Sequence, residues 1–339
     1  MTNHQSTPPR LPNLNDHPLI GDANKIPVSA PTPVVSISPI VLPAPDRIVD
    51  LHVRVTAPTS GHDLPIILLS HGQGTSLYLS SLNGYAPLAN FYASHGFVVI
   101  QPTHLSSKSL GLDCEMSSEA PFFWRSRVED MKLILEELYS IEIAFPQIQG
   151  RLDHTRVVAV GHSMGGHTVS MLLGARLIDP ENGDEIDLTE HRVKAGVVLA
   201  APGDGRGGEG LGEMVQDTFL KYHSHEEMTT PALVVIGDSD EQPYLTTRGP
   251  EYHADAYYSS KGPKSLLTIT GGRHGLGGVS GYDAAEAADD ECPERLATVQ
   301  RLTWAYLRSR LYPEDPAWSE ACFILQRFPG LARAESKRA

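Results

Sequence analysis

The chain has 339 residues, of which 40% are hydrophobic and 20% charged, a balance typical of one large α/β domain or at most two smaller ones. A core of that size needs neither disulfides nor a metal ion for its stability. The 27 Lys and Arg residues against 41 Asp and Glu give a formal net charge of -14, which argues against nucleic acid or an anionic membrane surface as a partner.

Residues 1–33 are polar and rich in proline, which predicts an extended or disordered N-terminal arm. The first residues contain no basic segment followed by an apolar one, so we expect no signal peptide and a cytoplasmic protein. No window approaches 18 consecutive apolar residues, and no membrane span is therefore expected.

Two β-rich runs follow at residues 34–42 and 48–55, and the second alternates apolar and polar residues as a half-exposed antiparallel strand does. Later apolar runs are continuous, which predicts strands buried on both faces of a parallel sheet. These runs are residues 66–70, 97–101, 157–161, 195–200, 232–236 and 266–269.

Helical patterns lie between and after these strands. One has a single apolar stripe formed by Trp124, Val128, Met131, Leu135 and Leu138. Another begins at Pro293, after the last strand. The alternation predicts an α/β domain over residues 34–312, with a mostly parallel central sheet and helices on both faces, followed by a C-terminal extension at 313–339.

Two segments have the pattern of insertions into this domain. Residues 180–190 are acidic and resemble a loop. Residues 203–230 begin with a glycine-rich stretch, and a connection of that length is usually functional or mobile. We expect residues 203–230 to form a flap or lid near the active site, with an uninvolved surface loop as the alternative.

The most informative motif is Gly161-His162-Ser163-Met164-Gly165-Gly166, which follows the apolar run 157–161 and precedes a mainly apolar run of helix length, 167–177. A buried strand, G-x-S-x-G and a helix form the nucleophile elbow of an α/β-hydrolase. Glycines flank the serine because a Cβ there would crowd the strained turn that exposes its hydroxyl. The motif predicts Ser163 as a catalytic nucleophile.

A serine nucleophile needs a base, and the base needs a carboxylate that fixes its tautomer. His274 follows the last strand in a glycine-flanked loop and is the expected base. Asp240 follows the preceding strand, which gives the chain order serine, acid, histidine of this fold. Asp204, just after an earlier strand, and Asp238 remain alternatives for the acid.

The tetrahedral intermediate needs two backbone N–H donors in an oxyanion hole. We expect them from Met164, directly after the nucleophile, and from Gln73, in the loop after the strand 66–70. His71 is expected to pack or bond beneath that loop.

Further side chains are candidates for contact with the substrate. Leu77 and Tyr78 are expected to line the acyl pocket, with packing in the core as the alternative, and His162 either contacts substrate or supports the elbow. His223 and His225 form an H-x-H pattern without further ligands, which indicates a solvated surface rather than a metal site. No metal and no cofactor are predicted.

With these residues in place, the sequence resembles the dienelactone-hydrolase-related esterases among the α/β-hydrolases, a group that includes bacterial cutinases and polyester hydrolases, chlorophyllases and platelet-activating-factor acetylhydrolases. The resemblance covers roughly residues 60–311. It rests on Ser70-His71-Gly72-Gln73-Gly74, the elbow, residues 231–240 and residues 271–274. It implies an α/β-hydrolase fold and Asp240 as the acid, as in cutinases, whereas the acetylhydrolases and chlorophyllases place the acid nearer Asp204.

The differences between this sequence and these families narrow the range of expected substrates. The region where many cutinases carry a tryptophan reads Ala201-Pro202-Gly203-Asp204, and the length of 203–230 is unlike a minimal cutinase. A serine in place of a cysteine argues against dienelactone hydrolysis itself. We therefore expect a serine carboxylesterase that acts on a small-molecule ester. A lactonase, an amidase or peptidase with the same triad, and a non-catalytic binding protein are the alternatives. The sequence predicts no oligomeric state.

Overall fold

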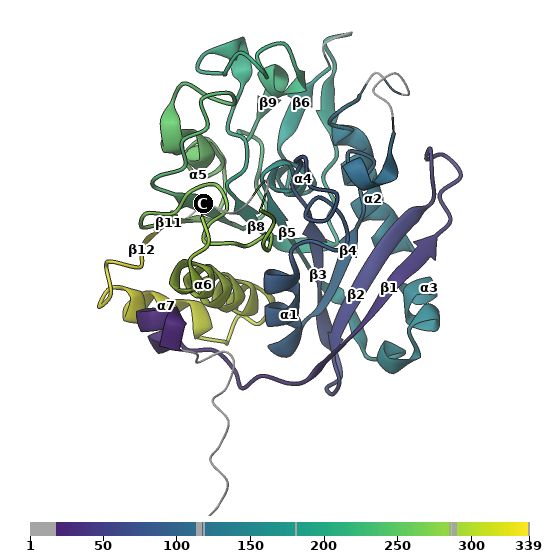
Figure 1. Ribbon diagram of the computed structural model, residues 1–339, viewed down its shortest axis with the longest axis vertical. Helices are drawn as coiled ribbons and strands as arrows, with labels where there is room; N and C mark the ends of the chain where they lie inside the picture. Colours follow the sequence, from purple (N-terminus) through teal and green to yellow (C-terminus); the bar gives the residue numbers. More distant parts are fainter. Residues whose placement is uncertain are drawn as a thin grey trace, which may run out of the picture.

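The computed structural model describes residues 18–112, 117, 119–179, 182–284, 286 and 290–337. A nine-stranded sheet forms its centre, in the order β1-β2-β4-β3-β5-β8-β10-β11-β12, with β1 and β12 at opposite sides of the molecule (Figure 1). The strands are β1 (Val34–Leu42), β2 (Leu51–Pro58), β3 (Leu64–Ser70), β4 (Val98–Pro102), β5 (Leu152–His162), β8 (Val193–Leu199), β10 (Ala232–Gly237), β11 (Lys264–Ile269) and β12 (Ala332–Lys337).

The six strands from β4 to β11 pair in parallel, whereas the pairs β1–β2, β2–β4 and β11–β12 are antiparallel. The predicted mostly parallel sheet is thereby confirmed. Every residue of β3, β4, β10 and β11 is buried, as expected of strands covered on both faces, and this includes the polar Gln101 of β4 and Lys264 of β11.

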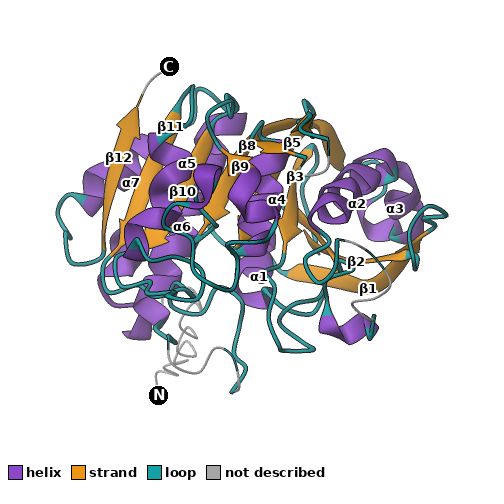
Figure 2. Ribbon diagram, turned by 90° about the horizontal axis from the view of Figure 1, so that it is seen from above, coloured by secondary structure: helices purple, strands orange, loops and turns teal. Residues whose placement is uncertain are grey.

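Helices cover both faces of the sheet. Side chains alternate between the two faces along each strand, so successive residues of β3 contact different helices. Ile66 and Leu68 pack with residues of α2, α3, α4 and α5, while Ile67 and Leu69 pack with α1, α6 and α7. Figure 2 shows this sheet among its helices from above. The helices are α1 (Ala86–Ser94), α2 (Trp124–Glu136), α3 (Leu138–Ala144), α4 (Met164–Leu172), α5 (Asp255–Tyr258), α6 (Pro293–Leu311) and α7 (Ala317–Leu325). Short 3-10 turns are η2 (Pro18–Lys25), η3 (Lys108–Leu110), η5 (Pro146–Ile148), η6 (Arg206–Gly208), η7 (Phe219–Tyr222) and η8 (Gly249–Ala254).

Three local expectations were wrong. The stripe from Trp124 to Leu138 is divided between α2 and α3, with Glu137 between the two helices. The run 167–177 is not one helix, since α4 ends at Leu172 and Gly174 adopts a φ of 111°, after which the chain turns into a strand. That strand, β6 (Arg176–Ile178), pairs with β7 (Glu185–Asp187) inside the segment expected to be a loop, and with β9 (His223–Ser224).

Residues on either side of the predicted domain pack against it. The turn η2 contacts α6, and Ile26 is fully buried, while residues 1–17 of the predicted arm lie outside the described residues. Beyond residue 312, α7 packs on α6 and β12 forms the edge of the central sheet. The described parts of both terminal segments therefore belong to the same packed unit as the sheet.

The segment 203–230 contains η6, η7 and β9. Its apolar residues Leu211, Val215 and Leu220 form a small separate core with Leu245 and Tyr252. Among the described helices, none combines the length and the hydropathy that a membrane crossing requires.

Candidate active site

Ser163 occupies a strained turn between β5 and α4. Its φ of 55° and ψ of -121° lie outside the regions that non-glycine residues favour, and its N–H donates to the carbonyl of Leu199 at 2.9 Å. A Cβ on Gly161 would lie 2.0 Å from the carbonyl oxygen of Gly165, and one on Gly165 would lie 2.1 Å from that of Ser70. The glycines of the motif are therefore required by backbone packing.

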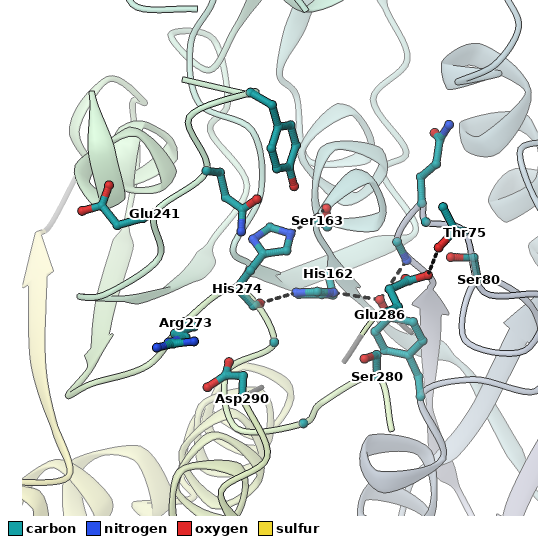
Figure 3. A pocket seen from close by; sticks show the side chains of 18 of the residues that line it. Thr75, Ser80, His162, Ser163, Glu241, Arg273, His274, Ser280, Glu286 and Asp290 are labelled. Atoms are coloured by element: carbon teal, nitrogen blue, oxygen red, sulfur yellow. Dashed lines mark hydrogen bonds between the residues drawn. The ribbon is translucent and has the colours of Figure 1, made fainter. Parts of the chain in front are cut away.

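The loops after β5, β10 and β11 bring Ser163, Asp240 and His274 together at the carboxyl ends of these parallel strands. The Ser163 Oγ lies 3.0 Å from His274 Nε2, and His274 Nδ1 lies 2.9 Å from Asp240 Oδ2. Figure 3 shows the serine and the histidine at the centre of the pocket lining. With a proton on Nδ1 that donates to Asp240, the Nε2 lone pair can accept the serine proton.

Asp240 is fully buried and lies between two histidines. His253 Nε2 is 3.3 Å from the same Oδ2, and His253 Nδ1 donates to the carbonyl of Ala201 at 2.7 Å. Burial alone would raise the pKa of the Asp240 carboxyl, but the hydrogen bond from His274 and the charges of His274 and His253 lower it below its usual value. Asp240 is thus held as a carboxylate. No motif in the sequence marks His253 as part of this site.

The two alternative acids bond elsewhere. Asp204 Oδ1 accepts from the backbone N–H of His225 at 2.7 Å and from its Nδ1 at 2.8 Å. Asp238 is exposed, and its Oδ1 accepts from the N–H of Gly271 at 2.7 Å. Neither carboxylate is bonded to His274 in the described part of the chain.

The loop after β3 lies beside the serine. The N–H of Gly72 donates to the Tyr85 hydroxyl at 3.0 Å, so it is already engaged, whereas Gln73 is the next residue along and lines the pocket. Met164 is the first residue of α4, where helical N–H groups have no partner within the helix.

His162 links the two sides of this site. Its Nδ1 lies 2.8 Å from the Tyr85 hydroxyl, and its Nε2 lies 2.7 Å from the backbone carbonyl of His274. Burial, together with the charge of His274, lowers the pKa of His162 to about 3, so the ring is neutral. A neutral ring that donates from Nε2 accepts the Tyr85 proton at Nδ1, and this chain of bonds connects the loop of Gly72 to the loop of His274 (Figure 3).

A buried polar network supports the loop after β3 from below. The expected position of His71 is confirmed: its Nε2 accepts from the N–H of His104 at 3.0 Å, and its carbonyl accepts from the buried Arg127. His104 bonds to Ser70 Oγ at 2.9 Å and to Asp130 at 2.8 Å. Burial raises the pKa of Asp130 to about 6, although the neighbouring Arg47 opposes the shift.

The pocket around Ser163 has a volume of about 640 Å³ and is mainly polar. Figure 3 shows Glu241 and Arg273 to one side of His274 and Thr75 and Glu286 to the other. Its lining consists of Gly72, Gln73, Gly74, Thr75, Ser80, Tyr85, His162, Ser163, Ser239, Glu241, Gln242, Tyr244, Arg273, His274, Gly275, Gly278, Ser280, Glu286 and Asp290.

Several residues expected near the substrate lie elsewhere. Leu77 and Tyr78 are 65% and 53% exposed and do not line this pocket, and neither does any described residue of 203–230.

His223 and His225 are fully buried, so the prediction that they form a solvated surface was wrong. Two histidines separated by one residue form too short a pattern to indicate whether their side chains are buried.

In comparisons with known proteins, the model of a family described as Alpha/beta hydrolase family matches residues 66–334. The match spans the sheet from β3 to β12 together with the three loops that carry Ser163, Asp240 and His274. No curated protein matches this chain.

Proposed function

The chain belongs to the α/β-hydrolase family, and from this premise we propose that it is a serine hydrolase that cleaves carboxylic esters through an acyl-enzyme. One observation carries the proposal: the continuous hydrogen-bonded series from Ser163 Oγ through His274 to the buried Asp240. A serine hydroxyl is a weak nucleophile alone, and this arrangement supplies the base and the group that orients the base.

In the proposed first half-reaction, Ser163 Oγ attacks the ester carbonyl carbon while His274 Nε2 takes its proton. Asp240 holds the Nδ1–H tautomer and stabilises the imidazolium that forms. The N–H groups of Gln73 and Met164 donate to the oxyanion. When the intermediate collapses, the bond to the alcohol oxygen breaks, and His274 returns the proton to the departing alcohol.

In the second half-reaction, a water attacks the acyl-enzyme and gives its proton to His274. Collapse of the second intermediate breaks the bond to Ser163 Oγ, which regains the proton from His274, and the carboxylic acid leaves. The cycle consumes one water per ester, and all proton transfers on the protein pass through His274.

The direct test is hydrolysis of short p-nitrophenyl esters by the wild type and by Ser163→Ala. We expect kcat to fall by about 10⁴–10⁶-fold in the variant, because residues of such a triad act as a unit. Ser319→Ala, which changes an exposed serine on α7, is the matched control and should turn over like the wild type. Equal turnover by wild type and Ser163→Ala would refute the assignment.

Reaction with a fluorophosphonate probe separates a catalyst from a binding protein on the same fold. An activated Ser163 becomes labelled, and the label is absent from Ser163→Ala. A wild type that stays unlabelled supports the binding protein. Lactone and peptide substrates, offered in the same assay, distinguish ester cleavage from lactonase or amidase activity.

Membership in the dienelactone-hydrolase-related esterase branch is part of this proposal. Its support is the sequence Ser70-His71-Gly72-Gln73-Gly74, the elbow with Met164, and the position of Asp240 after β10. The polar pocket lining favours a small, polar ester over a long acyl chain.

A further inference from the structure

Three buried histidines from two segments that are far apart in the sequence lie close together. One of them, His167, follows Ser163 by one helical turn. His167 lies in the first turn of α4, His223 lies in β9, and His225 follows two residues later. The ring centroids of His167 and His223 are 4.5 Å apart, and those of His223 and His225 are 4.4 Å apart. All three side chains are 0% exposed.

Asp204 fixes the orientation of one of these rings. Its Oδ1 accepts from both the backbone N–H and the Nδ1 of His225, so Nδ1 carries the proton and Nε2 carries a lone pair. Potential ligand atoms of Asp204, His223 and His225 all lie within 4.8 Å of one another. A carboxylate that bonds to one nitrogen of a histidine is the usual arrangement behind a histidine that ligates a metal through the other nitrogen.

The cluster contains polar atoms that the protein itself does not satisfy. Within the described part of the chain, neither ring nitrogen of His167 has a hydrogen-bond partner, and neither does Nε2 of His225. Buried polar groups in folded proteins are nearly always bonded, and exceptions call for an explanation such as an ion.

We propose that His167, His223 and His225, together with Asp204, form a binding site for a divalent transition-metal ion. Three imidazole nitrogens form a donor set that Zn²⁺ binds, and the Asp204 carboxylate orients one of these rings through its bond to Nδ1 of His225. The full burial of the three histidines leaves no position open to a substrate, so the site is structural rather than catalytic. Metal binding there holds the segment 203–230 against α4, and it is independent of the proposed hydrolysis.

Aromatic packing is the competing explanation for the cluster. The ring of Phe219 lies 5.0 Å from that of His167, and neutral imidazoles can pack as aromatic rings without a ligand. Under that explanation the protein retains no metal, and a chelator leaves its thermal stability unchanged.

The test uses the full chain, treated with a chelator, reloaded with Zn²⁺ and dialysed, with bound metal measured by mass spectrometry. We expect about one zinc per chain for the wild type and less than a tenth of that for His167→Leu and His225→Leu. Asp204→Asn keeps a side chain of the same shape and should lower the zinc affinity about 10–100-fold. The exposed His191→Ala controls for surface binding and should keep the metal.

A second control addresses the other nearby cluster, Asp240, His253 and His274. His253→Leu should retain the zinc, whereas loss of zinc from His253→Leu with retention in His167→Leu would overturn the proposal. Should a variant fail to fold, the wild type alone decides: Co²⁺ should give the intense visible absorption of a tetrahedral site, and chelation should lower the Tm. A wild type that binds neither ion contradicts the proposal.

Discussion

The carboxylate of Asp240 orients the base of the proposed mechanism. It is fully buried, bonded to His274 and adjacent to His253, so its charge is confined to the side of the imidazole that faces away from Ser163. That placement favours the Nδ1–H tautomer and the positive ring that forms during attack.

Asp240→Asn tests this role. The amide can offer its own N–H to His274 and thereby favour the wrong tautomer, so we expect kcat to fall by about 10⁴-fold with little change in the fold. Activity against p-nitrophenyl esters measures the loss. Asp238→Asn, in the same loop, should stay within a few-fold of the wild type. A larger loss in Asp238→Asn than in Asp240→Asn would contradict the assignment.

At this scale the sequence predicted a triad order, and it favoured Asp240, which follows the strand before that of His274, with Asp204 and Asp238 as alternatives. It could not predict His253, because η8 brings this histidine to the carboxylate from a segment with no motif. Nor could it predict that His223 and His225 are buried, since burial depends on where α4 and Asp204 lie in the fold.

Among the elements, the junction of β5 and α4 shows how backbone packing determines sequence. The backbones of β3 and α4 approach so closely that a Cβ on Gly165 would lie 2.1 Å from the Ser70 carbonyl oxygen and 2.8 Å from that of His71. Such contacts involve backbone on both sides, so no rotamer change can relieve them.

Gly165→Ala should therefore lower the free energy of unfolding by at least about 3 kcal/mol and displace the loop after β3. Chemical denaturation measures the change. Gly330→Ala is the matched control, because nothing lies within 4 Å of its added Cβ and its φ is compatible with alanine. It should change stability by less than about 0.5 kcal/mol. Similar values for the two variants would contradict this account of the elbow.

The strands could be predicted from sequence better than the helices. A strand buried on both faces needs an unbroken apolar run, and each such run matches an observed strand within a few residues. In α2, by contrast, the charged Arg127 and Asp130 lie outside the apolar stripe, yet both are buried in the network beneath His71 and His104. A sequence pattern shows where charged residues fall on a helix. It cannot show that such a residue is buried against a partner from another segment.

Across the whole molecule, many histidines are buried and neutral. Burial, the largest cause in each case, lowers the pKa of His162 to about 3 and that of His95 to about 4. In the unfolded chain these side chains titrate near pH 6.5. Between these values the two side chains bind more protons in the unfolded state than in the folded state, so their contribution to stability is full above about pH 6.5 and decreases as the pH falls below it.

We expect the Tm of the metal-free protein to fall from pH 6.5 to 5, with part of the decline below about pH 6 offset by Asp130, whose raised pKa of about 6 has the opposite effect. Each of the two histidines contributes about 1.4 kcal/mol per pH unit in that window. Calorimetry across the range measures the effect. His95→Gln should make the decline shallower. A Tm that rises on acidification to pH 5 would contradict the account.

The bonds of His162 divide the pocket into two walls with different tolerance to change. On one wall, Gly72, Tyr85, His162 and the backbone of His274 form a single bonded unit, so a substitution there disturbs the chemistry at once. The opposite wall presents Glu241, Gln242 and Tyr244 from the loop after β10. A library that randomises Glu241 and Tyr244 can alter which substrates the proposed hydrolase accepts while the reacting groups keep their positions, whereas Gln242 hydrogen-bonds to Asp240 and is best left unchanged.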